Sequence, residues 1–154
     1  EHKPDVGVMV VPNFALGAVL ATRFAREAAR FFASAEIIEL HHAGKVDAPS
    51  ATAIAAAAAV AAGRAQAGLG PVPDATERAT DGARGTVVDG IHLHSIRLPG
   101  LVAHLELLLG NTGTARRFSF TGGSGSFPGG GPGGGTFSFN GAGGSGGIQV
   151  PVTR

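Results

Sequence analysis

The sequence predicts an α+β fold in which a mixed or antiparallel sheet is covered on one face by helices. Three observations lead to this prediction. Two helical segments alternate with two short apolar segments, and four strand-like segments separated by turn signals follow them. A glycine-rich end then breaks the pattern. Helices that precede a run of strands in this order are typical of α+β domains.

The first predicted strand and helix occupy the beginning of the chain. Residues 6–11 form an apolar, mostly β-branched segment that ends at Pro12, which predicts a buried strand. Residues 14–32 are expected to form a helix because large apolar residues recur close to a 3.6-residue period. The residues of this predicted buried stripe are Leu16, Val19, Leu20, Phe24 and Phe31.

A second strand and a second helix flank a polar segment. Residues 36–40 have the composition of a strand that runs into a pair of histidines. Ser50 and Thr52 are both suitable N-caps for an alanine-rich helix that extends to about residue 67. Four further strands are predicted between turn signals, at residues 86–88, 92–98, 102–109 and 115–120.

Composition divides the chain into two parts. Residues 1–120 have the periodicity of a globular domain, whereas residues 121–154 hold most of the glycines. The stretch 128–135 is expected to be a mobile linker, because so much glycine cannot offset its own ordering entropy. A short Phe-Ser-Phe pattern at 118–120 recurs at 137–139. The second part is predicted to be a glycine-rich tail that is flexible or aberrant.

Composition also limits the classes of partner. A net charge of +1 gives no electrostatic argument for nucleic-acid binding. No apolar segment is long enough to span a bilayer, and the first residues lack the apolar core of a signal peptide. The absence of cysteine excludes disulfides and thiolate chemistry and fits a reducing compartment. We therefore expect a cytoplasmic protein with no membrane and no nucleic-acid partner.

The polar segment after the second predicted strand is the strongest candidate site. His41, His42 and Lys45 bring proton-transfer groups into one short loop. Ser50 and Thr52 open the next helix, whose first N–H groups and positive dipole end favour a bound carboxylate or phosphate. Such a combination would let an enzyme bind and protonate an acidic small molecule. From the residues alone, this interpretation and a purely structural loop both stay open.

A histidine metal site is a third interpretation of these imidazoles. His41 and His42 are adjacent, so they leave a strand on opposite sides and rarely chelate one ion. His92 and His94 share one strand face, and His104 lies on the next strand, but no HExxH or similar ligand spacing supports zinc. We therefore expect no metal ligand.

Three segments together resemble the dihydrodipicolinate reductases (4-hydroxy-tetrahydrodipicolinate reductases) of lysine and diaminopimelate biosynthesis. Residues 39–53 match the family signature as ELHHxxKxDAPSxTA. Pro12-Asn13-Phe14 matches the cofactor-facing hinge of the family, and residues 88–104 look like its later sheet. The three segments occur in the family's order over roughly residues 6–113.

The resemblance implies a role for each matching residue. His41 would be the general acid/base, Lys45 the proton donor, and His42 a substrate contact. Val11 to Phe14 would touch the nicotinamide end of NADPH or NADH, so that the implied cofactor-binding residues are Val11, Pro12, Asn13 and Phe14. The residues implied to hold a ring carboxylate are Ser50, Ala51 through its backbone, and Thr52.

The resemblance also implies a whole-protein function. Residues 1–120 would be the substrate-binding and tetramerisation domain of an oxidoreductase. That enzyme reduces a small unsaturated dicarboxylate to tetrahydrodipicolinate and forms a homotetramer through its sheet. The alternative from a different class is a non-catalytic fragment that serves oligomerisation or dicarboxylate binding.

The sequence departs from the family pattern at several positions. Ala51 replaces a glycine of the signature, and Leu105 replaces a glutamine of the later sheet. No GxGxxG turn lies near the start, so the nucleotide-binding half of the family is not found in this sequence. The sequence after Gly113 no longer follows the family and has the composition of a frameshifted end. The isolated chain is therefore expected to be inactive unless a nucleotide-binding domain is supplied.

Overall fold

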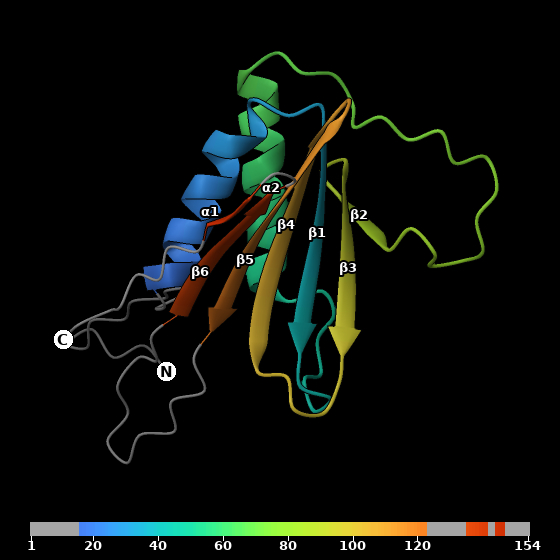
Figure 1. Cartoon of the computed structure of the whole chain (residues 1–154). Helices are drawn as coiled ribbons and strands as arrows, with labels where there is room; N and C mark the ends of the chain where they lie inside the picture. Colours follow the sequence, from blue (N-terminus) through green and yellow to red (C-terminus); the bar gives the residue numbers. More distant parts are fainter. Residues whose placement is uncertain (1–15, 123–134, 142–143, 147–154) are drawn as a thin grey trace, which may run out of the picture.

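A mixed sheet with helices on one face forms the described part of the chain, which comprises residues 16–122, 135–141 and 144–146 of a computed structural model (Figure 1). The sheet has seven strands in the order β2-β3-β1-β4-β5-β6-β7. This architecture confirms the predicted α+β fold. The strand expected at residues 6–11 lies outside the described residues.

Strand β1 lies inside the sheet between β3 and β4, and its pairing sets the geometry of the site. It runs parallel to β3 and antiparallel to β4, so the sheet is mixed. The parallel register places His41 directly opposite Arg97, at the end where both strands stop. The first five strands lie close to the predicted bounds: β1 (Ser34–His41), β2 (Thr86–Val88), β3 (Ile91–Arg97), β4 (Ala103–Asn111) and β5 (Thr114–Gly122).

Two further strands extend the sheet beyond β5. β6 (Gly135–Gly141) pairs antiparallel with β5, and β7 (Gly144–Gly146) pairs antiparallel with β6. The register sets Phe118 opposite Phe139, so the repeated Phe-Ser-Phe patterns are strand partners. The expected division after residue 120 therefore falls inside β5. Residues 128–134 of the expected linker lie outside the described residues.

Helix α1 (Leu16–Ala29) differs from the prediction in the face that it buries. Leu16, Val19 and Leu20 of the predicted stripe are 62%, 43% and 48% exposed, and Phe31 lies beyond the helix end and is 72% exposed. The buried face consists instead of alanines at helical spacing, namely Ala18, Ala21, Ala25 and Ala29. The predicted stripe was wrong because the buried face of α1 is made of small residues, which the periodicity of large apolar residues does not report.

Helix α2 (Ala51–Gln66) confirms the predicted alanine-rich helix and packs directly on α1. The helices approach most closely at Gly63, where an added Cβ would lie 2.0 Å from the carbonyl oxygen of Arg26. The buried residues of α2 are Ala53, Ala56, Ala57, Val60, Gly63 and Arg64. The contact at Gly63 therefore leaves no room for a side chain.

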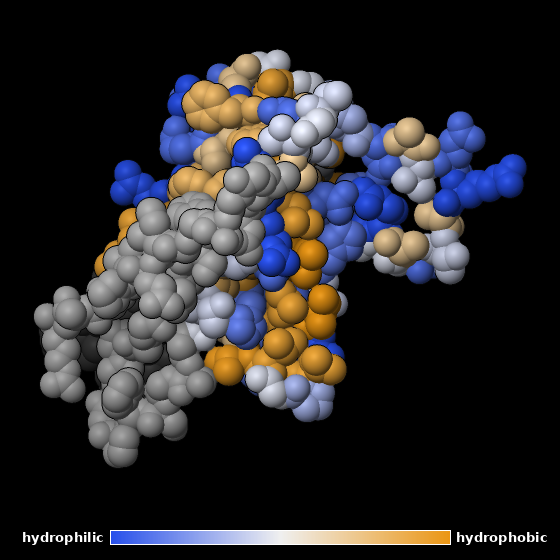
Figure 2. Space-filling model, in the orientation of Figure 1, coloured by the Kyte–Doolittle hydropathy of each residue, from blue (hydrophilic) through white to orange (hydrophobic). Residues whose placement is uncertain are grey.

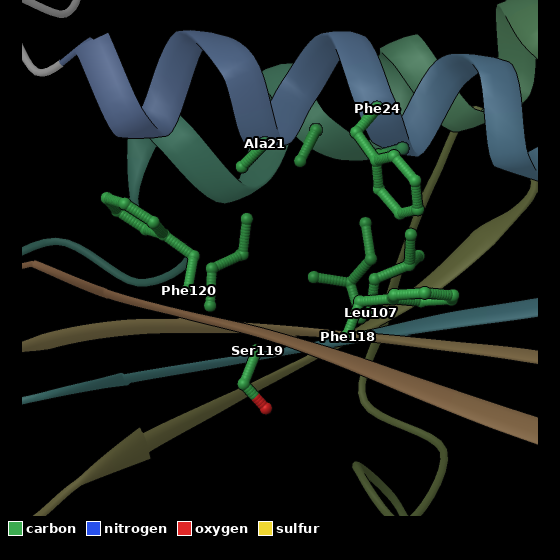
Figure 3. A pocket seen from close by; sticks show the side chains of 10 residues that line it. Ala21, Phe24, Leu107, Phe118, Ser119 and Phe120 are labelled. Carbon is green, nitrogen blue, oxygen red and sulfur yellow. The ribbon is translucent and has the colours of Figure 1, made fainter. Parts of the chain in front are cut away.

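The core lies between this helix layer and one face of the sheet. Phe118 and Phe120 point from β5 towards α1, whereas Ser119 points to the opposite side (Figure 3). Phe24, the one residue of the predicted stripe that turns inward, meets the Phe118 ring edge-on at 4.8 Å between centroids. Neither of the two described helices lies on the other face of the sheet, and hydrophobic residues gather over its strands there (Figures 1 and 2).

Candidate functional site

The alternation of side chains along β1 determines which of the two adjacent histidines enters the protein. Ile37 and Glu39 are fully buried on the helix-covered face, and His41 follows them on that same face at the end of the strand. His42 comes after the strand and is exposed. The two imidazoles therefore differ in exposure, with His41 half-buried and His42 exposed.

His41 shares a pocket of about 130 Å³ with the N-terminus of α2. Ser50 and Thr52 line this pocket together with His41, so the structure brings three of the predicted site residues into one space. The remaining wall comes from α1 and from the ends of β4 and β5, with the lining residues Ala18, Ala103, His104, Leu105, Phe120 and Gly122. The pocket therefore combines an imidazole, hydroxyls and an apolar wall.

Ser50 is the N-cap of α2, as the sequence predicted for this position or for Thr52. Its backbone is extended, with φ −69° and ψ 149°, and its Oγ accepts a hydrogen bond of 3.2 Å from the N–H of Ala53. The side chain is buried. Because the first N–H groups and the positive dipole end of a helix attract anions, this end of the pocket is suited to a carboxylate.

A buried carboxylate stands behind His41. Glu39 has no exposed surface, and its Oε2 is hydrogen-bonded to Nδ1 of His41. Its Oε1 accepts a 2.7 Å hydrogen bond from Nη2 of Arg97, and the same Nη2 donates to the backbone carbonyl of Asp47 at 2.8 Å. Lys45 Nζ in turn lies 2.6 Å from Oδ1 of Asp47. A continuous series of polar contacts thus joins His41 to Lys45.

These contacts set the charge states of the site. Burial raises the pKa of Glu39, but hydrogen bonds from Arg97, Ser95 and His41 outweigh it and leave the pKa lowered. Burial is also the largest cause of the lowered pKa of His41, and the hydrogen bond to Glu39 opposes this shift without overcoming it. The positive charges of Lys45 and Arg97 lower the pKa of His41 further. The carboxylate is therefore ionised and the imidazole neutral at neutral pH.

The hydrogen bond also selects the tautomer of His41. An ionised carboxylate accepts hydrogen bonds and donates none, so Nδ1 must carry the proton that it shares with Glu39. The lone pair of the neutral ring is then on Nε2. A histidine in this state can take a proton at Nε2, which is what a general acid/base requires.

The other predicted site residues lie outside this pocket. Lys45 does not line it, because its ammonium group is paired with Asp47. His42 is exposed, and Ala51 lines a neighbouring groove between α1 and α2. The residues expected to bind the cofactor, Val11, Pro12, Asn13 and Phe14, lie outside the described residues.

Glu39 and Arg97 belong to the site but were not predicted from the sequence. Glu39 could have been found, because it stands two residues before His41 on a predicted strand and so shares its face. Arg97 could not, because it reaches the site only through the parallel pairing of β1 with β3. His104 lines the pocket and its Nδ1 lies 3.1 Å from Thr121 Oγ1, a contact between neighbouring strands.

His92 and His94, two of the histidines considered for a metal, are engaged in ion pairs on the helix-free face. His94 Nε2 lies 2.8 Å from Glu36, and His92 Nε2 lies 3.3 Å from Asp74. Arg84 pairs with both carboxylates. Among the residues that the structure describes, no group of three or more metal-ligating side chains is assembled.

None of the described helices has the length and apolar character needed to cross a membrane.

Comparison with known proteins assigns the family. The family model described as "Dihydrodipicolinate reductase, C-terminus" matches residues 17–124. The 4-hydroxy-tetrahydrodipicolinate reductase of Cutibacterium acnes is 60% identical over 110 residues, which cover 71% of this chain and 45% of that protein. The protein of the same name from Bifidobacterium longum subsp. infantis is 62% identical over 123 residues, 77% of this chain and 48% of that protein.

A solved structure agrees in fold. Dipicolinate-bound dihydrodipicolinate reductase from Paenisporosarcina sp. TG-14 superposes with a TM-score of 0.63 at 47% identity, covering 70% of this chain and 40% of that chain. The chain spans less than half the length of each of these relatives. The family model, the relatives and the fold lead to one conclusion: the chain belongs to the dihydrodipicolinate reductase family and corresponds to its C-terminal part.

Proposed function

We propose that the chain is the substrate domain of a 4-hydroxy-tetrahydrodipicolinate reductase, an oxidoreductase of lysine and diaminopimelate biosynthesis. The observation that carries this proposal is the shared pocket of His41, Ser50 and Thr52. It places an acid/base group beside a helix N-terminus that favours a carboxylate. The proposed substrate is a small unsaturated ring dicarboxylate, in keeping with the dipicolinate bound to the structural relative.

The proposed roles follow from the position of each group. One ring carboxylate would be held at the start of α2 by Ser50, Thr52 and the backbone of Ala51. His41 would face the ring with Nε2 and exchange a proton there. Lys45 would supply the proton to the reduced ring, for which its ammonium group must leave Asp47. His42 would approach the substrate from the exposed side of the loop.

The proposed cofactor is NADPH or NADH. Reduction of the ring needs a hydride in addition to a proton, and a reduced nicotinamide supplies hydride when bound. The connection from β1 to α2, the one strand-to-helix connection between residues 16 and 122, contains a single glycine and no GxGxxG turn. The described residues therefore do not fit the pyrophosphate of a dinucleotide. Val11 to Phe14 remain the proposed nicotinamide contacts.

Calorimetry with pyridine-2,6-dicarboxylate tests the substrate site. The unaltered chain should bind this ring dicarboxylate, and Lys45→Ala should weaken binding by about tenfold through loss of one charge contact near the ligand. Arg78→Ala is the matched control, because it also removes one positive charge but from an exposed loop position with no assigned role. Equal affinity of Lys45→Ala and the unaltered chain would contradict the proposed site.

The alternative function is a non-catalytic module for dicarboxylate binding or oligomerisation. It is favoured by a pocket suited to a carboxylate in a described part of the chain that holds no GxGxxG turn. Turnover separates the two. Under the reductase proposal, the chain mixed with NADPH and substrate is inactive alone and becomes active when a nucleotide-binding domain is supplied. Failure of that mixture to react, with dicarboxylate binding intact, would favour the binding module.

We propose that the chain forms a homotetramer through the helix-free face of the sheet. This face carries half-buried Ile38, Leu40 and Leu108, and Ile96 is 41% exposed there. Sedimentation velocity should report a tetramer that Ile96→Glu dissociates. The control is Ile54→Glu, which puts the same charge on α2 in the helix layer, where Ile54 is 42% exposed. A monomer at all concentrations would refute this assembly.

A cytoplasmic location likewise stays a proposal.

A further inference from the structure

One guanidinium group connects the two proposed proton-transfer residues. Nη2 of Arg97 lies 2.7 Å from the buried carboxylate of Glu39 and 2.8 Å from the backbone carbonyl of Asp47. Glu39 is bonded to His41, and Asp47 is paired with Lys45. Every contact path between the imidazole and the ammonium group in this series passes through Arg97.

We propose that Arg97 is a positioning residue that keeps the His41 imidazole neutral and holds the Lys45 loop against the pocket. It acts through Glu39 on one side and through the Asp47 backbone on the other. The proposal rests on the proposed reductase function for the roles of His41 and Lys45. The arrangement itself is independent of any ligand.

The electrostatic part of the proposal follows from the burial of Glu39. A carboxylate without exposed surface needs a cationic partner, since an unpaired buried charge is strongly unfavourable. Arg97 is that partner, because a guanidinium stays protonated at all accessible pH values. If Arg97 were absent, the imidazolium form of His41 would become the partner instead. Because Arg97 supplies the positive charge that Glu39 needs, His41 can remain neutral.

Among the residues that the structure describes, no other charged group around His41 can take over this role. The groups that face it are Glu39 on β1, Arg97 on β3, and Lys45 and Asp47 on the loop. From the remaining walls of the pocket, α1 and α2 contribute Ala18, Ser50 and Thr52, and the ends of β4 and β5 contribute His104 as their titratable group. Lys45 is already paired with Asp47 at 2.6 Å. Arg97 is thus the cation bonded to Glu39.

The fold fixes the guanidinium in place. The parallel register sets Arg97 opposite His41, and the N–H of Leu98 donates to the carbonyl oxygen of His41 at 3.1 Å. Arg97 Nη1 also donates to the carbonyl of Ile96 at 2.8 Å. A planar guanidinium with several donors can satisfy these acceptors together, whereas an ammonium group acts as a point charge. The backbone pairing of β1 with β3 therefore holds the Arg97 guanidinium, which bonds the loop at Asp47, next to the end of β1 at His41.

Histidine NMR titration of the full chain tests the proposal. The His41 signal is assigned by its loss in His41→Gln, and its pKa and tautomer are then compared between the unaltered chain and Arg97→Met. Removal of the guanidinium should raise the pKa of His41 by about one unit. Arg117→Met is the matched control, because Arg117 lies on β5 and pairs at 3.8 Å with Glu106 of the neighbouring strand β4. It should leave the His41 pKa unchanged.

A second variant keeps the test decisive if Arg97→Met does not fold. Arg97→Gln retains N–H donors for Glu39 and Asp47 but carries no charge, so it should also raise the pKa of His41. Its affinity for pyridine-2,6-dicarboxylate should fall less than that of Arg97→Met, for which we expect about a tenfold loss. A His41 pKa that stays unchanged or falls in the folded variants would overturn the proposal.

The outcome separates this inference from the proposed function. The titration needs no ligand, so it measures the effect of Arg97 on His41 even if the chain binds no dicarboxylate. Absence of dicarboxylate binding by the unaltered chain would refute the proposed function and leave the titration result valid. Binding without a pKa change in the Arg97 variants would refute the positioning role and leave the proposed function in place.

Discussion

At the scale of single residues, the buried charge of Glu39 is the feature with the largest energetic consequence. Transfer of a carboxylate out of water costs several kcal/mol, and only good hydrogen bonds repay that cost. Glu39 receives them from Arg97 and His41, and a hydrogen bond with Ser95 also lowers its pKa. The stability of the folded protein therefore depends on the ionised Glu39 carboxylate, which solvent does not reach.

We expect acid to destabilise the protein through Glu39. Its pKa is lowered in the folded state, so its contribution is complete above the unfolded value of about 4.5 and is lost as pH falls through the folded pKa. Urea unfolding between pH 7 and pH 3 measures this as a falling free energy of unfolding. Glu39→Gln should unfold more easily at pH 7, by about 3 kcal/mol, and should show a flatter pH dependence. Parallel curves for the two proteins would contradict this prediction.

The N-cap of α2 gives a second prediction at this scale. Ser50→Ala removes the acceptor of the Ala53 N–H, and because Ser50 is 4% exposed, water cannot readily replace it. We expect the free energy of unfolding to fall by about 1–2 kcal/mol. Thermal and urea unfolding at pH 7 measure the change. A variant as stable as the unaltered chain would show that Oγ does not support the helix.

At the scale of elements, the helix layer depends on small residues. α2 meets the backbone of α1 at Gly63, the buried residues of α1 are alanines, and Leu16, Val19 and Leu20 of α1 are exposed. Helices that meet through small side chains approach closely and lose tolerance for added volume. The addition of one methyl group can therefore change the free energy of unfolding strongly here.

Gly63→Ala should destabilise the protein although alanine is the better helix former. The new Cβ would lie 2.0 Å from the carbonyl oxygen of Arg26, so the helices must separate. We expect a loss of about 2 kcal/mol in the free energy of unfolding, against a gain of about 1 kcal/mol from propensity alone. Gly70→Ala is the control, since its Cβ would meet open space. Stabilisation by Gly63→Ala would show that the close contact is absent.

The elements themselves could be predicted from the sequence, but their partners could not. Strand bounds follow from local signals such as Asp89-Gly90, which forms a turn with positive φ at both residues. The buried face of α1 was predicted wrongly because Leu16 and Leu20 carry the periodicity while alanines make the contact. For the site, His41 and the helix start at Ser50 could be identified from adjacent residues. Arg97 depends on a parallel pairing that no local pattern encodes.

At the scale of the whole molecule, the two described helices cover one face of the sheet and leave the other without a helix from the described residues. β1 lies inside the sheet, with β3 on one side and β4 on the other, whereas β2 lies at an edge. Strands that are paired on both sides open only when a large part of the structure opens. The described part should therefore have a stable centre around β1 and a less stable margin at β2.

Hydrogen exchange measures this difference. We expect the amides of β1 (Ser34–His41) to exchange slowest and those of β2 (Thr86–Val88), a three-residue strand, to exchange much faster. Mass spectrometry of peptides from both strands gives the two rates in one experiment. Similar protection of β1 and β2 would contradict the strand order.

The contact between Glu39 and Arg97 also has a consequence for biosynthesis. The two residues are 58 positions apart, so the ribosome delivers the carboxylate and the histidine well before the guanidinium. Contacts of long sequence separation form late, because the intervening chain must first be ordered. A nascent chain that has completed α2 but not β3 therefore lacks the partner of its buried charge. Completion of the proton-transfer site thus coincides with the docking of β3, which makes this site a late product of folding.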